Sequence, residues 1–146
     1  VGAQYNSTNI RVGIYHCSWN LIREHMLAGV GAGSDNKLLM DCYSRMPTDA
    51  YQKTFYNTHN QYVNFWLVSG IFSLLLFAAS LVYAFLLSIR RKDHTLLFFL
   101  ILMSVAFLSE NVLSSQAGVV FYYFFLCLMI ARISLPGNST GLAPRE

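Results

Sequence analysis

A long run without charged residues, from Tyr62 to Ile89, constrains this chain more than any other feature of its sequence. The run holds about 28 residues, and a helix of that length would be about 42 Å long. Because the hydrocarbon core of a bilayer is about 30 Å thick, such a helix must tilt in the membrane or protrude from it. The run therefore predicts a membrane-spanning helix.

Two further apolar segments follow this run. Between Thr95 and Ala131 the only charged residue is Glu110, and charged residues make up only 12% of the chain. The pattern predicts an all-α, polytopic membrane protein with three transmembrane helices, at about residues 62–89, 95–114 and 117–135. The net charge of +3 does not indicate nucleic-acid binding, because the basic residues are scattered or lie at the ends of the spans.

The basic cluster Arg90-Arg91-Lys92 gives the expected orientation. It lies between the first two spans, and the positive-inside rule places it in the cytoplasm. Residues 1–61 and the turn near Glu110 then face the opposite side of the membrane. The tail, residues 136–146, is rich in Gly, Ser and Pro, and we expect it to be disordered in the cytoplasm.

The pattern of apolar residues in residues 1–61 predicts two short amphipathic helices, which lie on the membrane or pack over the spans. The first is expected to end at Gly29, and the second to be capped by Asp35 and to end before Pro47. The apolar face of the first is expected to contain Tyr15, Trp19, Ile22 and Met26, and that of the second Leu38, Leu39, Cys42 and Tyr43.

The three cysteines show no CxxC or Cys/His metal spacing. Cys17 and Cys42 can form a disulfide if residues 1–61 face an oxidising compartment. The preferred interpretation is that the cysteines are buried free thiols.

The polar segment Thr58-His59-Asn60-Gln61 directly precedes the first span and matches a capping box, with Thr58 as the cap. His59 would then be the first helical residue, where the helix dipole favours the neutral imidazole that a general base requires. Free N–H groups at a helix start can also bind phosphate. The alternative is an interfacial histidine that hydrogen-bonds lipid headgroups or loop carbonyls.

Two further charged residues are candidates for a site with His59. A carboxylate at the edge of a span, such as Glu110, is costly and usually has a role. It can orient a base, or it can bond to neighbouring polar groups. Arg11 can bind a pyrophosphate through its forked guanidinium, or it can be a solvated charge. The segment Gly29–Gly33 can cradle a phosphate or form a plain turn; it lacks the Gly-Lys-Ser/Thr ending of a P-loop.

Four motifs, in order, resemble the C-terminal part of the O-antigen ligase and polymerase superfamily. His59-Asn60 is followed by nine residues and Gly70, as in that family. The chain departs from the family pattern at Ser73, where the family often has Gly, Thr or Tyr. It departs again at Ser115 or Gln116, where the family usually has a basic residue. The other matching segments are Arg11-Val12-Gly13-Ile14-Tyr15, Leu27 to Gly33, and Ser109-Glu110-Asn111-Val112-Leu113 with Gly118-Val119-Val120-Phe121.

The resemblance implies a multi-pass protein of the bacterial inner membrane. Residues 1–61 would form most of a helical periplasmic loop, and the three spans would be the last of about a dozen. The chain starts at Val1, and we expect N-terminal transmembrane helices of the same protein to precede it.

The reaction that the resemblance implies is the transfer of a glycan from undecaprenyl diphosphate to an acceptor hydroxyl, as in O-antigen ligation to lipid A-core. The transfer would be inverting and would use neither a metal nor a cofactor. His59 would act as the base and Arg11 would bind the diphosphate, with Glu110, Asn60 and Gln61 in support. Alternatives are an O-antigen polymerase, a protein O-oligosaccharyltransferase, and a non-catalytic transmembrane subunit or degenerate homologue.

Overall fold

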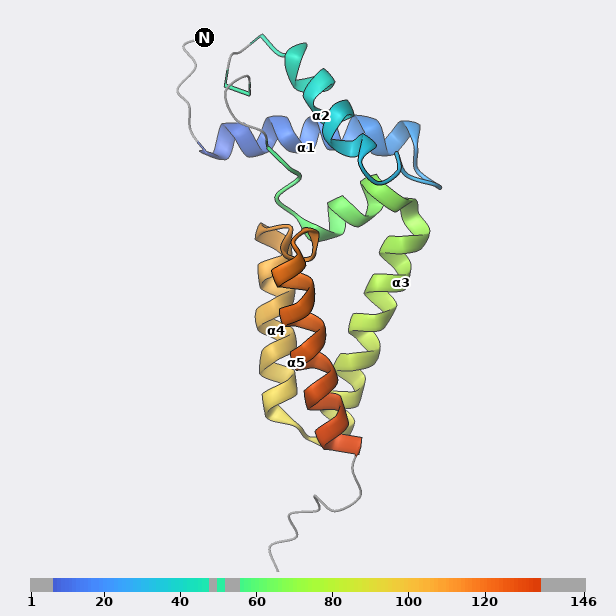
Figure 1. The fold of residues 1–146 in the computed structure, drawn as a ribbon, viewed down its shortest axis with the longest axis vertical. Coiled ribbons are helices and arrows are strands. Elements are labelled where there is room, and N and C mark those ends of the chain that lie inside the picture. The colour runs from blue at the N-terminus through green and yellow to red at the C-terminus, as the bar shows by residue number, and fades with distance from the viewer. Residues whose placement is uncertain (1–6, 48–49, 52–55, 135–146) are drawn as a thin grey trace, which may run out of the picture.

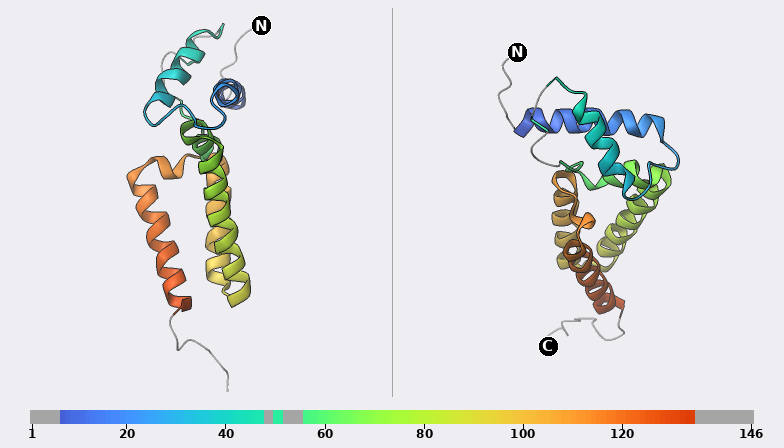
Figure 2. Two further views of the ribbon diagram at one scale, coloured as in Figure 1. Left: turned by 90° about the vertical axis from the view of Figure 1, so that its right-hand side faces the viewer. Right: turned by 45° about the horizontal axis from the view of Figure 1, so that its top comes forward.

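The computed structural model describes residues 7–47, 50–51 and 56–134. Three helices run alongside one another, and α1 lies across one end of them with α2 packed on it (Figures 1 and 2). The described residues contain no strand, which confirms the all-α class. The predicted disordered tail lies outside these residues. The elements are α1 (Ser7–Glu24), α2 (Ser34–Ser44), α3 (Gln61–Arg91), α4 (His94–Ser109), the 3-10 helix η1 (Val112–Ser114) and α5 (Gln116–Ser134).

Two of the three predicted spans, α3 and α5, are long and apolar enough to cross a membrane. Their outward faces are covered by exposed apolar side chains such as Leu76 and Phe124. The helix α4 is more apolar than either but has only 16 residues, a length of about 24 Å. It ends at Ser109 rather than at the predicted Ser114, because Glu110 has extended backbone dihedral angles and turns the chain.

The long helix α3 is broken at Gly70, whose φ of 76° and ψ of −177° are not helical. The part after Gly70 has about 21 residues and is about 32 Å long, which matches the thickness of a hydrocarbon core. The part before it bends toward α1 (Figure 1). The predicted span therefore consists of two helical parts joined by a bend at Gly70.

The loop between α1 and α2 fits into this break. The break leaves backbone groups of α3 without helical partners, and the loop supplies new ones. The three hydrogen bonds run from Val30 N–H to the Leu67 carbonyl (2.8 Å), from Gly31 N–H to the Val68 carbonyl (2.9 Å) and from Ile71 N–H to the Met26 carbonyl (3.0 Å). Gly29–Gly33 is thus a docked turn, and the amides of Val30 and Gly31 are not free to cradle a phosphate.

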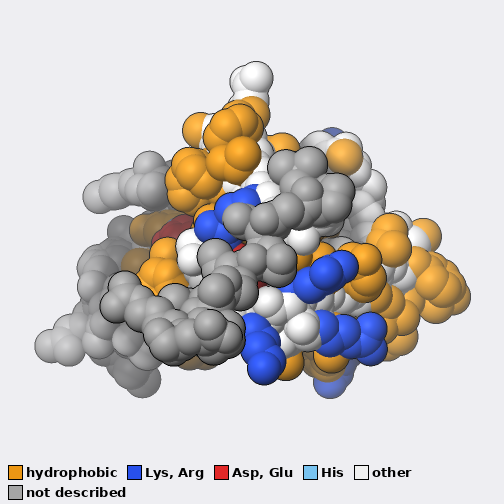
Figure 3. Space-filling view, turned by 90° about the horizontal axis from the view of Figure 1, so that it is seen from below, with side chains coloured by type: hydrophobic (Ala, Val, Ile, Leu, Met, Phe, Trp, Pro, Cys, Tyr) orange, Lys and Arg blue, Asp and Glu red, His pale blue; other side chains and the backbone are white. Residues whose placement is uncertain are grey.

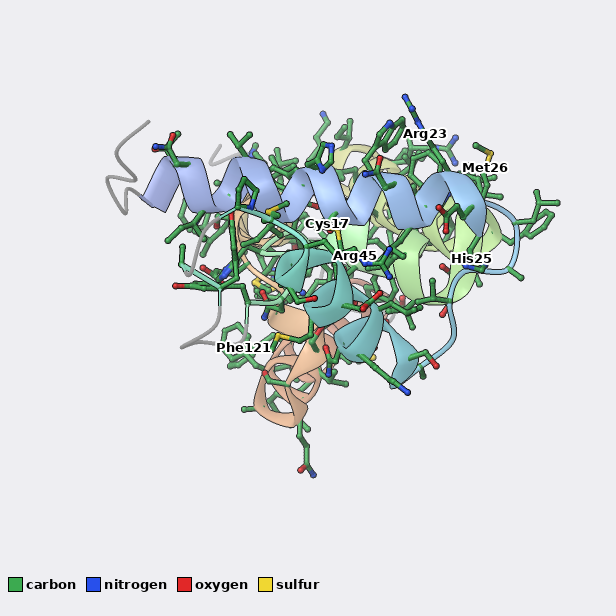
Figure 4. The ribbon with its side chains drawn as sticks, turned by 90° about the horizontal axis from the view of Figure 1, so that it is seen from above. Cys17, Arg23, His25, Met26, Arg45 and Phe121 are labelled. Carbon is green, nitrogen blue, oxygen red and sulfur yellow. A yellow bond between two sulfur atoms is a disulfide. The ribbon has the colours of Figure 1, made fainter. Side chains whose placement is uncertain are left out.

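A disulfide between Cys17 and Cys42 joins α1 to α2 (Figure 4). The preferred interpretation as buried free thiols was wrong for this pair, because the packing of the two helices brings both cysteines into one core. Cys127 is a free thiol, but it is exposed on α5. The core around the disulfide includes Ile14, Ile22, Leu39, Tyr43 and Leu67.

Three details of the predicted loop helices differ from the structure. The first helix, α1, ends at Glu24 rather than near the predicted Gly29, so Met26 lies in the turn after it. The buried face of α1 contains Ile14 and Cys17, and of the predicted face only Ile22 is buried, whereas Tyr15, Trp19 and Met26 are exposed. Asp35 lies in the first turn of α2 and does not cap it, because Gly33 occupies the cap position in a left-handed conformation. The predicted apolar side of α2 does pack inward, through Leu39 and Tyr43.

The opposite end of the bundle is basic. Figure 3 views this end and shows Lys and Arg side chains gathered there. Arg90, Arg91 and Lys92 are exposed, and Arg132 at the end of α5 pairs with Asp93 in the turn between α3 and α4. The basic cluster and α1 thus lie at different ends of the helices, as the predicted orientation requires.

Candidate functional site

Three charged or titratable side chains that are distant in sequence meet beside α1. Nδ1 of His59 lies 3.2 Å from Oε2 of Glu110, and Nη2 of Arg11 lies 3.9 Å from Oε1 of the same carboxylate. Arg11 comes from α1, His59 from the turn before α3, and Glu110 from the end of α4. The structure therefore brings together the residues that the sequence nominated as base, diphosphate ligand and supporting carboxylate.

His59 lies outside α3 rather than in its first turn. The cap of α3 is Asn60, whose Oδ1 accepts hydrogen bonds from the amides of Tyr62 (3.0 Å) and Val63 (3.1 Å). The predicted capping box with Thr58 was wrong, because the Thr58 hydroxyl contacts the side chain of Asn111. The amides of Tyr62 and Val63 are thus occupied, and the imidazole has Glu110 as its partner.

The backbone at His59 is unusual. Its φ is 45°, in the left-handed region that residues other than glycine seldom adopt. The conformation is supported by the His59 amide, which donates to Oδ1 of Asn57 at 2.9 Å. Strained positions of this kind cost about 1–3 kcal/mol and often occur at functional sites. Here the strained backbone directs the ring toward Glu110.

Asn60 and Gln61 connect α3 to the end of α4 and the turn after it. Nδ2 of Asn60 donates to the Leu108 carbonyl at 3.3 Å. Gln61 is buried, and its Oε1 accepts from the Leu113 amide at 2.7 Å. Both side chains therefore hold the turn that carries Glu110 close to the start of α3.

The contact with Glu110 assigns the tautomer of His59. An ionised carboxylate can only accept, so Nδ1 carries the proton, and in the neutral form of the ring Nε2 keeps its lone pair. A histidine oriented by a carboxylate in this way is suited to accept a proton at Nε2. The side chains are open to solvent, with 27% of His59, 44% of Arg11 and 56% of Glu110 accessible.

An apolar groove of about 450 Å³ lies between α1 and the first part of α3. Its lining includes Val12, which follows Arg11 on α1, and Val63 in the first turn of α3. Trp19 and Trp66 pack edge to face in it, with ring centroids 5.7 Å apart. The sequence analysis did not identify Trp66 as part of a site; a Trp near the end of a span, where aromatic belts form, was the available signal. The remaining lining residues are Tyr15, His16 and Ile22.

Asn111 is a second residue that the sequence analysis did not place in the site. It is buried, follows Glu110 directly, and bonds to residues on both sides of His59. The available signal was its place directly after Glu110, in the segment from Ser109 to Leu113 that resembles the family pattern.

The exposed apolar faces of α3 and α5 are typical of a helical membrane protein, and the polar site lies at one end of these helices. Residues 1–78 match the family model described as O-antigen ligase, which is more than half of the 146 residues, and the chain belongs to that family. The match includes Arg11, His59 and Gly70. No curated protein matches the chain. Membership indicates glycan transfer in a membrane.

Proposed function

We propose that the chain carries part of the active site of a bacterial inner-membrane glycosyltransferase, which moves a glycan from undecaprenyl diphosphate to an acceptor hydroxyl. The observation that carries the proposal is the Glu110 carboxylate, which contacts His59 with one oxygen and faces Arg11 with the other. Upstream helices of the same protein would complete the site, and residues 1–61 would be periplasmic.

In the proposed step, Nε2 of His59 takes the proton of the acceptor hydroxyl. The acceptor oxygen forms a bond to the anomeric carbon of the glycan, and the bond between that carbon and the diphosphate oxygen breaks. Attack from the face opposite the leaving group inverts the anomeric centre. Glu110 accepts the Nδ1–H hydrogen bond throughout and stabilises the charge that develops on the ring.

Arg11 would stabilise the departing diphosphate. Negative charge builds on the leaving oxygen, and a preplaced guanidinium meets it without a metal ion or a cofactor. The loose distance of 3.9 Å from Arg11 to Glu110 leaves other N–H groups of the fork for phosphate oxygens. The apolar groove, which is lined by Val12, the residue after Arg11, would receive the first isoprene units of the donor.

The acceptor that we propose is a sugar of lipid A-core, which makes the reaction an O-antigen ligation. Polymerisation of O-antigen and transfer to protein use the same donor and the same step, and differ only in the hydroxyl that enters.

The test is His59→Ala in the full-length protein, reconstituted with a lipid-linked glycan and lipid A-core. A general base contributes about 10²–10⁴ to a rate, so we expect transfer to fall by at least a hundredfold while membrane insertion stays normal. His94→Ala, which changes an exposed histidine at the other end of the bundle, serves as the control and should keep full activity. Transfer retained in His59→Ala would overturn the assignment of His59 as the base.

A further inference from the structure

A closed set of hydrogen bonds surrounds His59 and passes through one side chain, that of Asn111. Nδ2 of Asn111 donates to Oγ1 of Thr58 at 2.8 Å. The Thr58 hydroxyl donates to the Asn60 carbonyl at 3.2 Å, and the Asn60 amide donates back to Oδ1 of Asn111 at 2.7 Å. The two residues that flank His59 are therefore both held by Asn111.

This arrangement is buried although the histidine itself is not. Thr58 is 1% exposed and Asn111 is 8% exposed. Inside a protein such bonds are stronger than in water, and a lost partner leaves a buried polar group unsatisfied. These hydrogen bonds therefore keep the backbone of His59 in its left-handed conformation.

Asn111 also fixes the other half of the contact, because it follows Glu110 directly in the chain. Asn111 thus positions both partners of the contact, the imidazole of His59 and the carboxylate of Glu110. We propose that Asn111 is a positioning residue for glycan transfer, acting through the His59–Glu110 contact; this inference rests on the proposed function of that site.

A positioning role for Asn111 predicts a loss of kcat with little change in KM. Asn111→Ala should lower kcat of transfer about tenfold to a hundredfold and leave KM for the lipid-linked glycan within about threefold, since the change misplaces the base rather than the donor. Asn111→Asp keeps an acceptor for the Asn60 amide and for the Thr58 hydroxyl, so it should retain more activity than Asn111→Ala. Tyr62→Phe removes a different bond between α3 and α4, from the Tyr62 hydroxyl to the Ser104 carbonyl, and is the control for packing.

A double-mutant cycle with Glu110→Gln measures the coupling. If Asn111 acts through the contact, Asn111→Ala should cost less than about threefold once Glu110 is already changed, because coupled residues are not additive. An equal loss in both backgrounds would show that Asn111 acts on the fold in general and would overturn the proposal.

A spectroscopic measurement separates this inference from the proposed function. In full-length protein with ¹⁵N-labelled histidine, at alkaline pH where the ring is neutral, His59 should show the tautomer protonated at Nδ1. Asn111→Ala should show a mixture of both tautomers, and Tyr62→Phe should match the wild type. An unchanged tautomer in Asn111→Ala overturns the positioning role even if the wild-type protein transfers glycan. A wild-type protein without transfer activity but with the expected tautomer change would reject only the proposed function.

Discussion

Replacing Gly70 with alanine tests how the site is assembled. Gly70 has a φ and ψ that only glycine adopts readily, and an added Cβ would lie 2.0 Å from the Leu27 carbonyl oxygen. The loop after α1 would have to leave the break in α3, and its hydrogen bonds to α3 would be lost. Because α1 carries Arg11 and α3 begins beside His59, undocking also separates the two parts of the site.

The size of the effect follows from these contacts. The backbone strain costs about 1–3 kcal/mol, and each of the three lost hydrogen bonds about 1 kcal/mol. The sum is about 4–6 kcal/mol, or a fall of about 10 °C or more in the unfolding temperature. Gly31→Ala is the matched control, because Gly31 also has a positive φ (87°) but an added Cβ meets nothing within 4 Å. It should cost only about 1–2 kcal/mol.

Intrinsic tryptophan fluorescence during thermal unfolding of the full-length protein in detergent is a suitable assay. Nε1 of Trp66 donates to the Met26 carbonyl at 3.2 Å, so this ring reports on the docked loop directly. We expect Gly70→Ala to unfold at a much lower temperature than Gly31→Ala. Equal unfolding temperatures for the two variants would refute the account of the break and the loop.

Two further predictions concern the ends of the molecule. The Cys17–Cys42 disulfide closes a separation of 25 residues, and its reduction should lower the free energy of unfolding by about 3 kcal/mol. Dithiothreitol should therefore lower the unfolding temperature of the wild type but not that of the double variant Cys17→Ser/Cys42→Ser. A wild-type unfolding temperature that dithiothreitol leaves unchanged would contradict this prediction. At the other end, burial opposes ionisation of Asp93, but the Leu96 amide and Arg132 outweigh it and lower the pKa of Asp93 below its ordinary 3.8. A carboxylate whose pKa is lowered by folding stabilises the fold at pH values above its pKa in the unfolded chain, and it loses that contribution as the pH falls through its pKa in the folded protein. The unfolding temperature of Asp93→Asn should therefore depend less on pH below about 4 than that of the wild type.

Apolar patterning alone predicted the helical class and the approximate positions of α3, α4 and α5. It did not predict the break at Gly70, because a glycine inside an apolar run is compatible with a continuous helix. The break depends on a loop from elsewhere in the chain that supplies hydrogen bonds to it. Contacts between residues distant in the sequence leave no periodic pattern from which they could be predicted. The pairing of Cys17 with Cys42 is another contact of this kind.

The candidate site was predictable in its members but not in its connections. His59, Glu110 and Arg11 each stood out by residue type and position. Their contacts depend on α1 crossing the end of the bundle, which sequence spacing does not determine. The capping error at Thr58 has a similar origin: Thr58 and Asn60 are both good capping residues, and Asn111, distant in the sequence, engages Thr58.

The central claim is that Glu110 orients His59 for proton transfer, and the rate of glycan transfer by Glu110→Gln tests it most directly. The variant keeps the size of the side chain and removes the charge that holds Nδ1–H. A hydrogen bond to a charged group is worth about 1.5–3 kcal/mol, so the rate should fall about tenfold to a hundredfold at unchanged protein level in reconstituted membranes. A rate equal to that of the wild type would contradict the account.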